Sequence, residues 1–91
     1  MALQILNAGE NGDAEKISDD LRGRIEAAIE GAEVSVTANG PGHFEIRVVS
    51  SSFEGLSRVK QQQRVYGAIA ELMAGPNAPV HAIDKLECLL P

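Results

Sequence analysis

The sequence predicts an α+β domain with the element order helix, strand, strand, short helix or turn, helix and strand. Apolar and polar residues alternate on both sides of a turn-forming run at residues 38–42, which is the pattern of a β-hairpin. Apolar residues recur at helical spacing before and after this hairpin. Roughly thirty residues that include a helix separate the second and third strands, enough for a crossover between parallel neighbours. We therefore expect a three-stranded mixed sheet covered by helices on one face.

The first elements are a leader and a helix. Residues 1–16 contain Asn, Gly, Asp and Glu without sustained periodicity, so we expect a flexible N-terminal leader before a single domain over residues 17–91. Ser18 is a suitable N-cap and Gly31 provides a stop, which places the helix at about residues 18–30. The apolar stripe of this helix consists of Leu21, Ile25, Ala28 and Ile29.

Two short strands and their connecting turn follow. Val34 and Val36 alternate with polar residues, and the run Ala-Asn-Gly-Pro-Gly at residues 38–42 has turn chemistry. The alternation then resumes with apolar residues that share one face of the second strand, namely Phe44, Ile46 and Val48. This segment is predicted to be a hairpin.

The second half of the chain supplies a turn, a helix and a strand. Phe53 is expected to anchor a tight turn that Gly55 relieves. Helical spacing then returns with Val65, Ile69, Leu72 and Met73. Tyr66 is expected to be half-buried on this helix, which ends near Gly75. Two prolines within the next four residues force a non-helical link before the last strand at residues 80–86.

The predicted crossover has a consequence for the two histidines, because parallel neighbouring strands begin at the same edge of a sheet. His43 opens the second strand and His81 opens the third, so both are expected at one rim beside the hairpin loop, Asn39, Gly40 and Pro41. Imidazole binds metals and carries protons, so a pair suits metal binding or pH sensing. No third ligand at a metal-binding spacing accompanies them. The alternative for each histidine is a structural or simply exposed role.

Acidic and basic residues are distributed unevenly along the chain. The formal net charge is −5, and nine of the 13 acidic residues lie within residues 1–45. Between Gly55 and Ala70 the only charged residues are three bases, Arg58, Lys60 and Arg64. This basic patch is compatible with a solvated helix face, a phosphate-binding surface or a docking surface for a protein partner.

No arrangement typical of an enzyme active site occurs in the sequence. A Ser-His-Asp arrangement, a phosphate-binding GxxxxGK loop and a clustered acid pair are all missing, so we expect a protein that is not an enzyme. The lone Cys88 is expected to be a buried structural thiol because it lies in an apolar run beside an acidic residue. It cannot form an internal disulfide, and no apolar run reaches the length of a membrane span, which favours a reducing cytoplasm.

Four motifs follow one another in the chain. They are Gly42-His43-Phe44, Phe53-Glu54-Gly55, the segment RVKQQQRVYG from Arg58 to Gly67, and Val80-His81-Ala82-Ile83. In this order they resemble the BolA family, in which a Ser-His-Phe-like strand leads into an FEG or FDG turn, a basic helix and a late histidine that opens the last strand. The run SRVKQQQRVYG is most similar to the IbaG-like (YrbA-like) bacterial subgroup.

The resemblance implies a type II KH-like fold and a role in iron-sulfur cluster trafficking or in iron and stress regulation. In BolA proteins the residue that matches His81 ligates a [2Fe-2S] cluster shared with a monothiol glutaredoxin, whose cysteine and bound glutathione supply the other side. The cluster is therefore expected only in complex with glutaredoxin and glutathione. Many relatives carry a second ligand, Cys or His, in the hairpin loop, whereas residues 39–42 contain neither. His43 is the substitute candidate by position.

The resemblance also leaves other partners open. The alternative function is that of a KH-like nucleic-acid-binding transcriptional regulator that acts through Arg58, Lys60 and Arg64. A KH module holds the nucleic-acid backbone with a GXXG loop, and Gly55-Leu56-Ser57-Arg58 lacks the second glycine. The negative net charge also opposes binding to a polyanion. We therefore rank the glutaredoxin adaptor first, with the basic patch as a docking surface, and leave a homodimer open.

Overall fold

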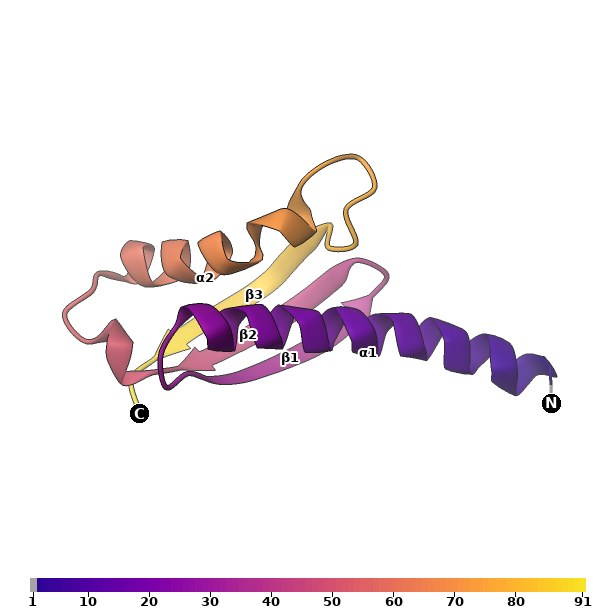
Figure 1. Ribbon diagram of the computed structural model, residues 1–91, viewed down its shortest axis with the longest axis horizontal. Coiled ribbons are helices and arrows are strands. Elements are labelled where there is room, and N and C mark those ends of the chain that lie inside the picture. The colour runs from indigo at the N-terminus through magenta and orange to yellow at the C-terminus, as the bar shows by residue number, and fades with distance from the viewer. Residues whose placement is uncertain (1) are drawn as a thin grey trace.

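The computed structural model describes the backbone of residues 2–91 and the side chains of residues 13–91. Two long helices and three strands follow one another in the predicted order (Figure 1). Their bounds are α1 Ala2–Ala28, β1 Glu33–Gly40, β2 His43–Val49, the 3-10 turn η1 Ser51–Phe53, α2 Arg58–Met73 and β3 Ala82–Leu89. The α+β class and the element order predicted from the sequence are confirmed.

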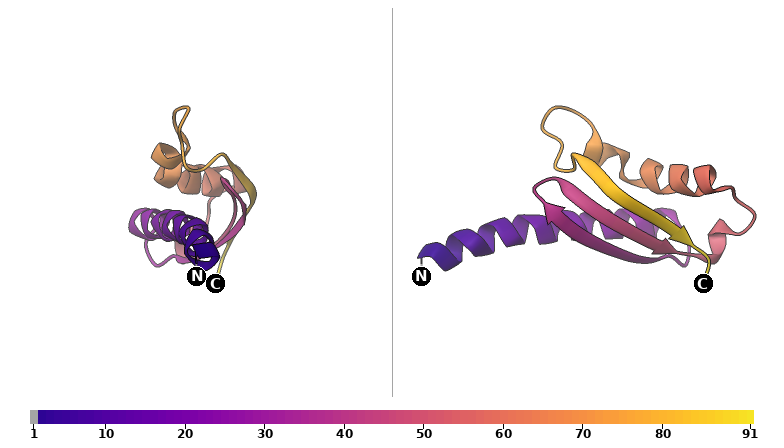
Figure 2. Two further views of the ribbon diagram at one scale, coloured as in Figure 1. Left: turned by 90° about the vertical axis from the view of Figure 1, so that its right-hand side faces the viewer. Right: turned by 180° about the vertical axis from the view of Figure 1, so that it is seen from behind.

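The sheet is mixed, with β2 at its centre. β1 pairs with β2 in the antiparallel direction, and β2 pairs with β3 in the parallel direction. The crossover that joins β2 to β3 contains η1 and α2 and runs over the same face of the sheet that α1 covers (Figure 2). Both helices therefore lie on one face, as the sequence predicts, and the opposite face of the sheet carries no helix.

The core lies between the helices and the inner face of the sheet. Each long helix contributes three buried side chains at helical spacing, and β2 contributes every second residue. The buried apolar residues are Leu21, Ile25 and Ile29 of α1, Phe44, Ile46 and Val48 of β2, Val65, Ile69 and Leu72 of α2, together with Phe53 and Val80. The two aromatic rings of this core, Phe44 and Phe53, belong to the motifs that define the family resemblance.

The first helix is longer than the sequence pattern predicts. α1 begins at Ala2, so the expected start at Ser18 is wrong, and Ser18 lies inside a helix instead of capping one. The segment contains no proline, and an anchored helix extends at little cost once its packed turns have formed. The N-terminal part of α1 projects beyond the sheet (Figure 1). Flexibility of residues 1–16 stays a prediction.

The second half of the chain follows the predicted order, with differences at Tyr66 and at the bounds of the last strand. α2 begins at Arg58, where the Ser57 side chain accepts a hydrogen bond from the Lys60 N–H and caps the helix. Tyr66 is 38% exposed and lies outside the core, since Val65 occupies the core-facing position beside it. The last strand begins at Ala82 and continues to Leu89, later at both ends than predicted.

A buried serine joins the end of β2 to the end of α1, a feature that the sequence analysis missed. Ser50 is 1% exposed, and its hydroxyl donates to the Glu30 carbonyl at 2.9 Å while accepting from the Ser52 N–H at 3.0 Å. The Ser52 hydroxyl donates to the same carbonyl at 3.0 Å. Two hydroxyl groups thus satisfy a carbonyl that follows the last turn of α1 and has no partner within the helix.

We predict that Ser50→Ala lowers the free energy of unfolding by about 1–3 kcal/mol, because it removes a buried hydrogen-bonded hydroxyl. Ser51→Ala is the matched control, since Ser51 is exposed and a surface change is expected to alter stability by about 0.5 kcal/mol or less. Urea unfolding followed by circular dichroism measures both. Equal losses for the two variants would contradict the role assigned to Ser50.

Candidate functional site

The hairpin loop and the start of β3 meet at one rim of the sheet. The Gly42 carbonyl accepts two backbone hydrogen bonds, from the His81 N–H at 2.8 Å and from the Ala82 N–H at 3.0 Å. His43 is the register partner of Ala82. The main chains of both histidines therefore come together beside the loop, as the predicted parallel pairing requires, while their role as ligands stays a prediction.

His81 precedes the first residue of β3 and is exposed to solvent. Its ring lies against the backbone of Gly42, with Nδ1 and Cγ as the nearest ring atoms. Nε2 is on the side of the ring away from these atoms. Among the side chains that the structure describes, His81 forms no ion pair or side-chain hydrogen bond.

His43 points to the face of the sheet that carries no helix, because the neighbouring Phe44 takes the buried face. Its Nδ1 lies 3.0 Å from Oδ1 of Asp84, and the two side chains are 48% and 40% exposed. The Asn39 side-chain amide donates to Oε2 of Glu45 at 2.7 Å and to Oδ2 of Asp84 at 3.4 Å. An amide from the end of β1, a histidine and two carboxylates thus form one polar cluster at the rim.

Asp84 reaches this cluster because the pairing of β2 with β3 is irregular at this point. Phe44 pairs with Ile83 and Glu45 pairs with Lys85, so Asp84 is the extra residue of a bulge. A bulge redirects one side chain and shifts the later pairs by one position. The bulge interrupts the alternation in the sequence, since Ile83 and Leu86 both pack against the core but are three residues apart. This spacing is the signal that could have placed Asp84 in the site.

The Asp84 carboxylate determines which nitrogen of His43 carries the proton. An ionised carboxylate only accepts hydrogen bonds, so Nδ1 is the donor and the neutral ring keeps its lone pair on Nε2. Hydrogen bonding to His43, followed by that to Asn39, lowers the pKa of Asp84 below its ordinary value of 3.8, although partial desolvation opposes the shift. A carboxylate that orients a histidine in this way is a common companion of metal-binding imidazoles.

The rim does not by itself form a closed metal site. Within the described part of the chain, no group of three or more His, Cys, Asp and Glu side chains is arranged to hold a metal ion. Cys88 is partly buried on the core side of β3, and burial raises the pKa of its thiol. Cys88 is thus less buried than predicted, and its structural role stays a prediction.

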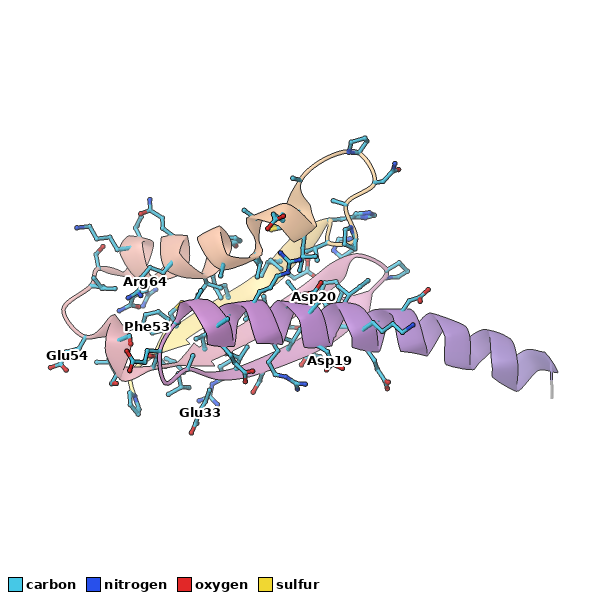
Figure 3. The ribbon with its side chains drawn as sticks, in the orientation of Figure 1. Asp19, Asp20, Glu33, Phe53, Glu54 and Arg64 are labelled. Carbon is cyan, nitrogen blue, oxygen red and sulfur yellow. The ribbon has the colours of Figure 1, made fainter. Side chains whose placement is uncertain are left out.

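The basic patch of Arg58, Lys60 and Arg64 lies on the first turns of α2 and is exposed. In Figure 3, Arg64 lies at the same end of the molecule as Phe53 and Glu54. The 16 residues of α2 span about 24 Å, and the rim lies beyond the opposite end of this helix (Figure 1). The structure therefore does not bring the patch and the histidines together. Over residues 13–91 no carboxylate pairs with any of the three bases.

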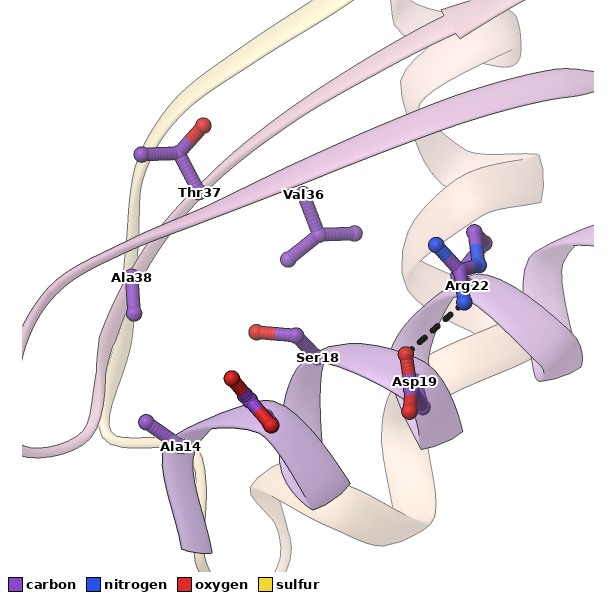
Figure 4. A pocket seen from close by; sticks show the side chains of 8 residues that line it. Ala14, Ser18, Asp19, Arg22, Val36, Thr37 and Ala38 are labelled. Atoms are coloured by element: carbon purple, nitrogen blue, oxygen red, sulfur yellow. Dashed lines mark hydrogen bonds and ion pairs between the residues drawn. The ribbon is translucent and has the colours of Figure 1, made fainter. Parts of the chain in front are cut away.

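A cleft of about 540 Å³ lies elsewhere, between α1 and β1 (Figure 4). Its walls include Ser18 and the exposed ion pair between Asp19 and Arg22, whose atoms are 2.7 Å apart. Neither histidine lines this cleft. It opens where α1 departs from the sheet, and it adds no chemistry to the rim.

Comparison with known proteins agrees with this arrangement. The model of the family described as BolA-like protein matches residues 23–88, which include the hairpin, both motifs of the crossover and His81. The chain belongs to the BolA family. It is an IbaG-like member, 35% identical over 67 residues to the acid stress protein IbaG of Escherichia coli strain K12, an alignment that covers 74% of this chain and 76% of the relative.

Solved BolA structures share the fold. A BolA homologue from Coxiella burnetii is 28% identical with a TM-score of 0.65, and the match covers 81% of this chain and 90% of that structure. The BolA domain of SufE1 from Arabidopsis thaliana superposes with a TM-score of 0.68 at 23% identity, covering 81% and 91% of the two chains. The KH-like label stays a prediction. None of the helices in the described part of this BolA protein is long and apolar enough to cross a membrane.

We predict that Asp84 titrates below 3.8 and that His43→Ala raises its titration midpoint, because the largest cause of the lowered pKa is then removed. Since the folded state favours the carboxylate, Asp84 stabilises the fold above its ordinary pKa, and this stabilisation is lost as the pH falls through the lowered pKa. Carboxyl carbon NMR measures the midpoint. His81→Ala is the control and leaves it unchanged. A midpoint that does not respond to His43→Ala would contradict the pairing.

Proposed function

We propose that this BolA protein is an adaptor that binds a monothiol glutaredoxin and shares a [2Fe-2S] cluster with it, in iron-sulfur cluster trafficking or in iron and stress regulation. The observation that carries this proposal is the exposed His81 at the start of β3. The His81 N–H donates to the Gly42 carbonyl, and this backbone bond holds the residue at the rim. Its side chain has no hydrogen-bond or ion-pair partner among the described residues. The glutaredoxin cysteine and a glutathione thiolate supply the ligands on the other side of the cluster.

The chemistry of His81 suits a cluster that passes between proteins. A neutral imidazole is a good iron ligand, and replacing thiolate by histidine raises the reduction potential of such a cluster. Because a histidine ligand must be deprotonated at the coordinating nitrogen, protonation competes with the metal and favours release. An exposed ring at the edge of the sheet can meet the cluster without opening the core.

His43 is proposed as the second ligand from this chain. Its hydrogen bond to Asp84 leaves the lone pair on Nε2, which is the form that binds metal. This carboxylate pairing supports a ligand role although the loop itself contains neither Cys nor His. The alternative is that the pair of His43 and Asp84 only fastens the hairpin to β3 and that water or a partner group completes the coordination of the iron.

The basic patch at Arg58, Lys60 and Arg64 is proposed to attract the partner before the cluster is engaged. Charges far from the ligands act mainly on the rate of encounter and on the orientation of approach. Exposed Val59, at 61%, and Tyr66, at 38%, add apolar surface beside these bases. We propose that the partner meets the patch at one end of α2 and reaches the rim beyond the other end.

Nucleic-acid binding receives no specific support from the site. The connection from Gly55 to the start of α2 lacks a second glycine, and the net charge of −5 repels a polyanion. The three bases of the patch are the only part of the chain that favours this function. We therefore do not propose it.

We predict that His81→Ala changes the visible absorption and circular dichroism spectra of the cluster formed by this protein, a monothiol glutaredoxin and glutathione. The reason is that one ligand to iron is replaced or lost. The measurement is anaerobic cluster reconstitution followed by spectroscopy and by size-exclusion chromatography of the complex.

Cys88→Ala is the matched control, because Cys88 is the single cysteine of the chain and is partly buried away from the rim. It is expected to leave the spectrum unchanged. An unchanged spectrum and unchanged association for His81→Ala would remove the central assignment. His43→Ala tests whether His43 is the second ligand. A changed spectrum supports a ligand role, and a wild-type spectrum supports a purely structural role.

We predict that replacing Arg58, Lys60 and Arg64 together by Glu slows association with glutaredoxin by about tenfold or more at low salt, because steering charges are reversed. Stopped-flow measurement at several ionic strengths tests this. The spectrum of the assembled cluster is expected to stay the same. A wild-type association rate that does not fall with rising ionic strength would contradict the steering role of the patch.

A further inference from the structure

Gly42 makes the closest approach between the hairpin loop and His81. A Cβ atom placed on Gly42 would lie 2.6 Å from Nδ1, 2.7 Å from Cγ and 3.1 Å from Cβ of His81. These distances are shorter than any ordinary contact between carbon atoms or between carbon and nitrogen. Of the glycines in the described part of the chain, Gly42 alone has a neighbour within 4 Å of that position.

The same residue also fixes the main chain of His81. The Gly42 carbonyl accepts the N–H groups of both His81 and Ala82, so the backbone that carries the imidazole is fastened to the loop. The atoms closest to the missing side chain are Nδ1 and Cγ of the ring, followed by Cβ, so the collision reaches the base of the side chain and not only a flexible tip. A side chain at position 42 can be accommodated only by rotating the His81 ring or by breaking these backbone bonds.

We propose that Gly42 is a positioning residue for His81. Its lack of a side chain lets the imidazole rest with the Nδ1 edge against the loop, and this leaves Nε2 as the atom presented to a metal centre. The orientation of the ring follows from the contacts of the chain alone. The statement that this orientation serves cluster ligation rests on the proposed function.

A purely conformational role for Gly42 is the competing explanation, because its φ of +77° lies in the region that favours glycine. The chain offers a matched control for it. Gly55 has a φ of +78°, and a Cβ atom at that position would have no neighbour within 4 Å. Gly42→Ala and Gly55→Ala therefore place an alanine at nearly the same φ, and only Gly42→Ala meets the His81 ring.

The first experiment uses the isolated protein. Three-bond coupling constants and nuclear Overhauser effects measure the χ1 angle of His81 and the contact of its ring with residue 42. Gly42→Ala is expected to change the χ1 angle and to lose the contact, whereas Gly55→Ala keeps both. A ring that stays in place in Gly42→Ala overturns the inference, whatever the function of the protein.

A double-mutant cycle tests the same contact through stability. If the added methyl group collides with the ring, Gly42→Ala lowers the urea midpoint less in a His81→Ala background than in the wild type. Gly55→Ala is expected to lower it equally in both backgrounds. If Gly42→Ala alone does not fold, recovery of folding in the double variant supports the contact. Equal effects of Gly42→Ala in both backgrounds overturn it.

The last experiment adds the monothiol glutaredoxin, glutathione and the cluster. Gly42→Ala is expected to weaken cluster retention by about 10- to 100-fold, the range typical of residues that orient a metal ligand, whereas Gly55→Ala retains it. A displaced ring with wild-type retention overturns the positioning role. A wild-type spectrum for His81→Ala contradicts the proposed function instead. The ring orientation measured in the isolated protein then still shows whether Gly42 positions the His81 ring.

Discussion

The double pairing of β2 is the constraint on which the rest of this structure depends. β2 is the only strand hydrogen-bonded on both edges, and its inner face buries three side chains beneath both long helices. A shift of one residue in its register would turn Phe44 and its neighbours toward solvent and His43 toward the core. The position of the histidine is thus fixed by the burial of the apolar residues beside it.

This constraint explains which features could be read from the sequence. Alternation at Phe44, Ile46 and Val48 predicts β2 because the burial of one face leaves a period of two, and the length of the crossover predicts the parallel partner. The rim follows from these two facts, since parallel strands begin together. The position of His81 beside the loop could therefore be predicted from the sequence alone.

Features that depend on single contacts could not be read in the same way. The bulge that brings Asp84 to His43 interrupts the alternation between Ile83 and Leu86, but this spacing does not say which side chain Asp84 meets. Ser50 resembles the serines around it in sequence, and only burial distinguishes it. The start of α1 was missed because capping chemistry at Ser18 is a local preference, which an already anchored helix can override.

The placement of Cys88 limits the thiol chemistry of this protein. Its side chain lies on the core side of β3, and burial keeps the thiol protonated. A protonated, partly buried thiol is a slow nucleophile toward disulfides, so mixed disulfide formation with glutathione is disfavoured. Oxidants that act on thiolates are for the same reason expected to react slowly with Cys88.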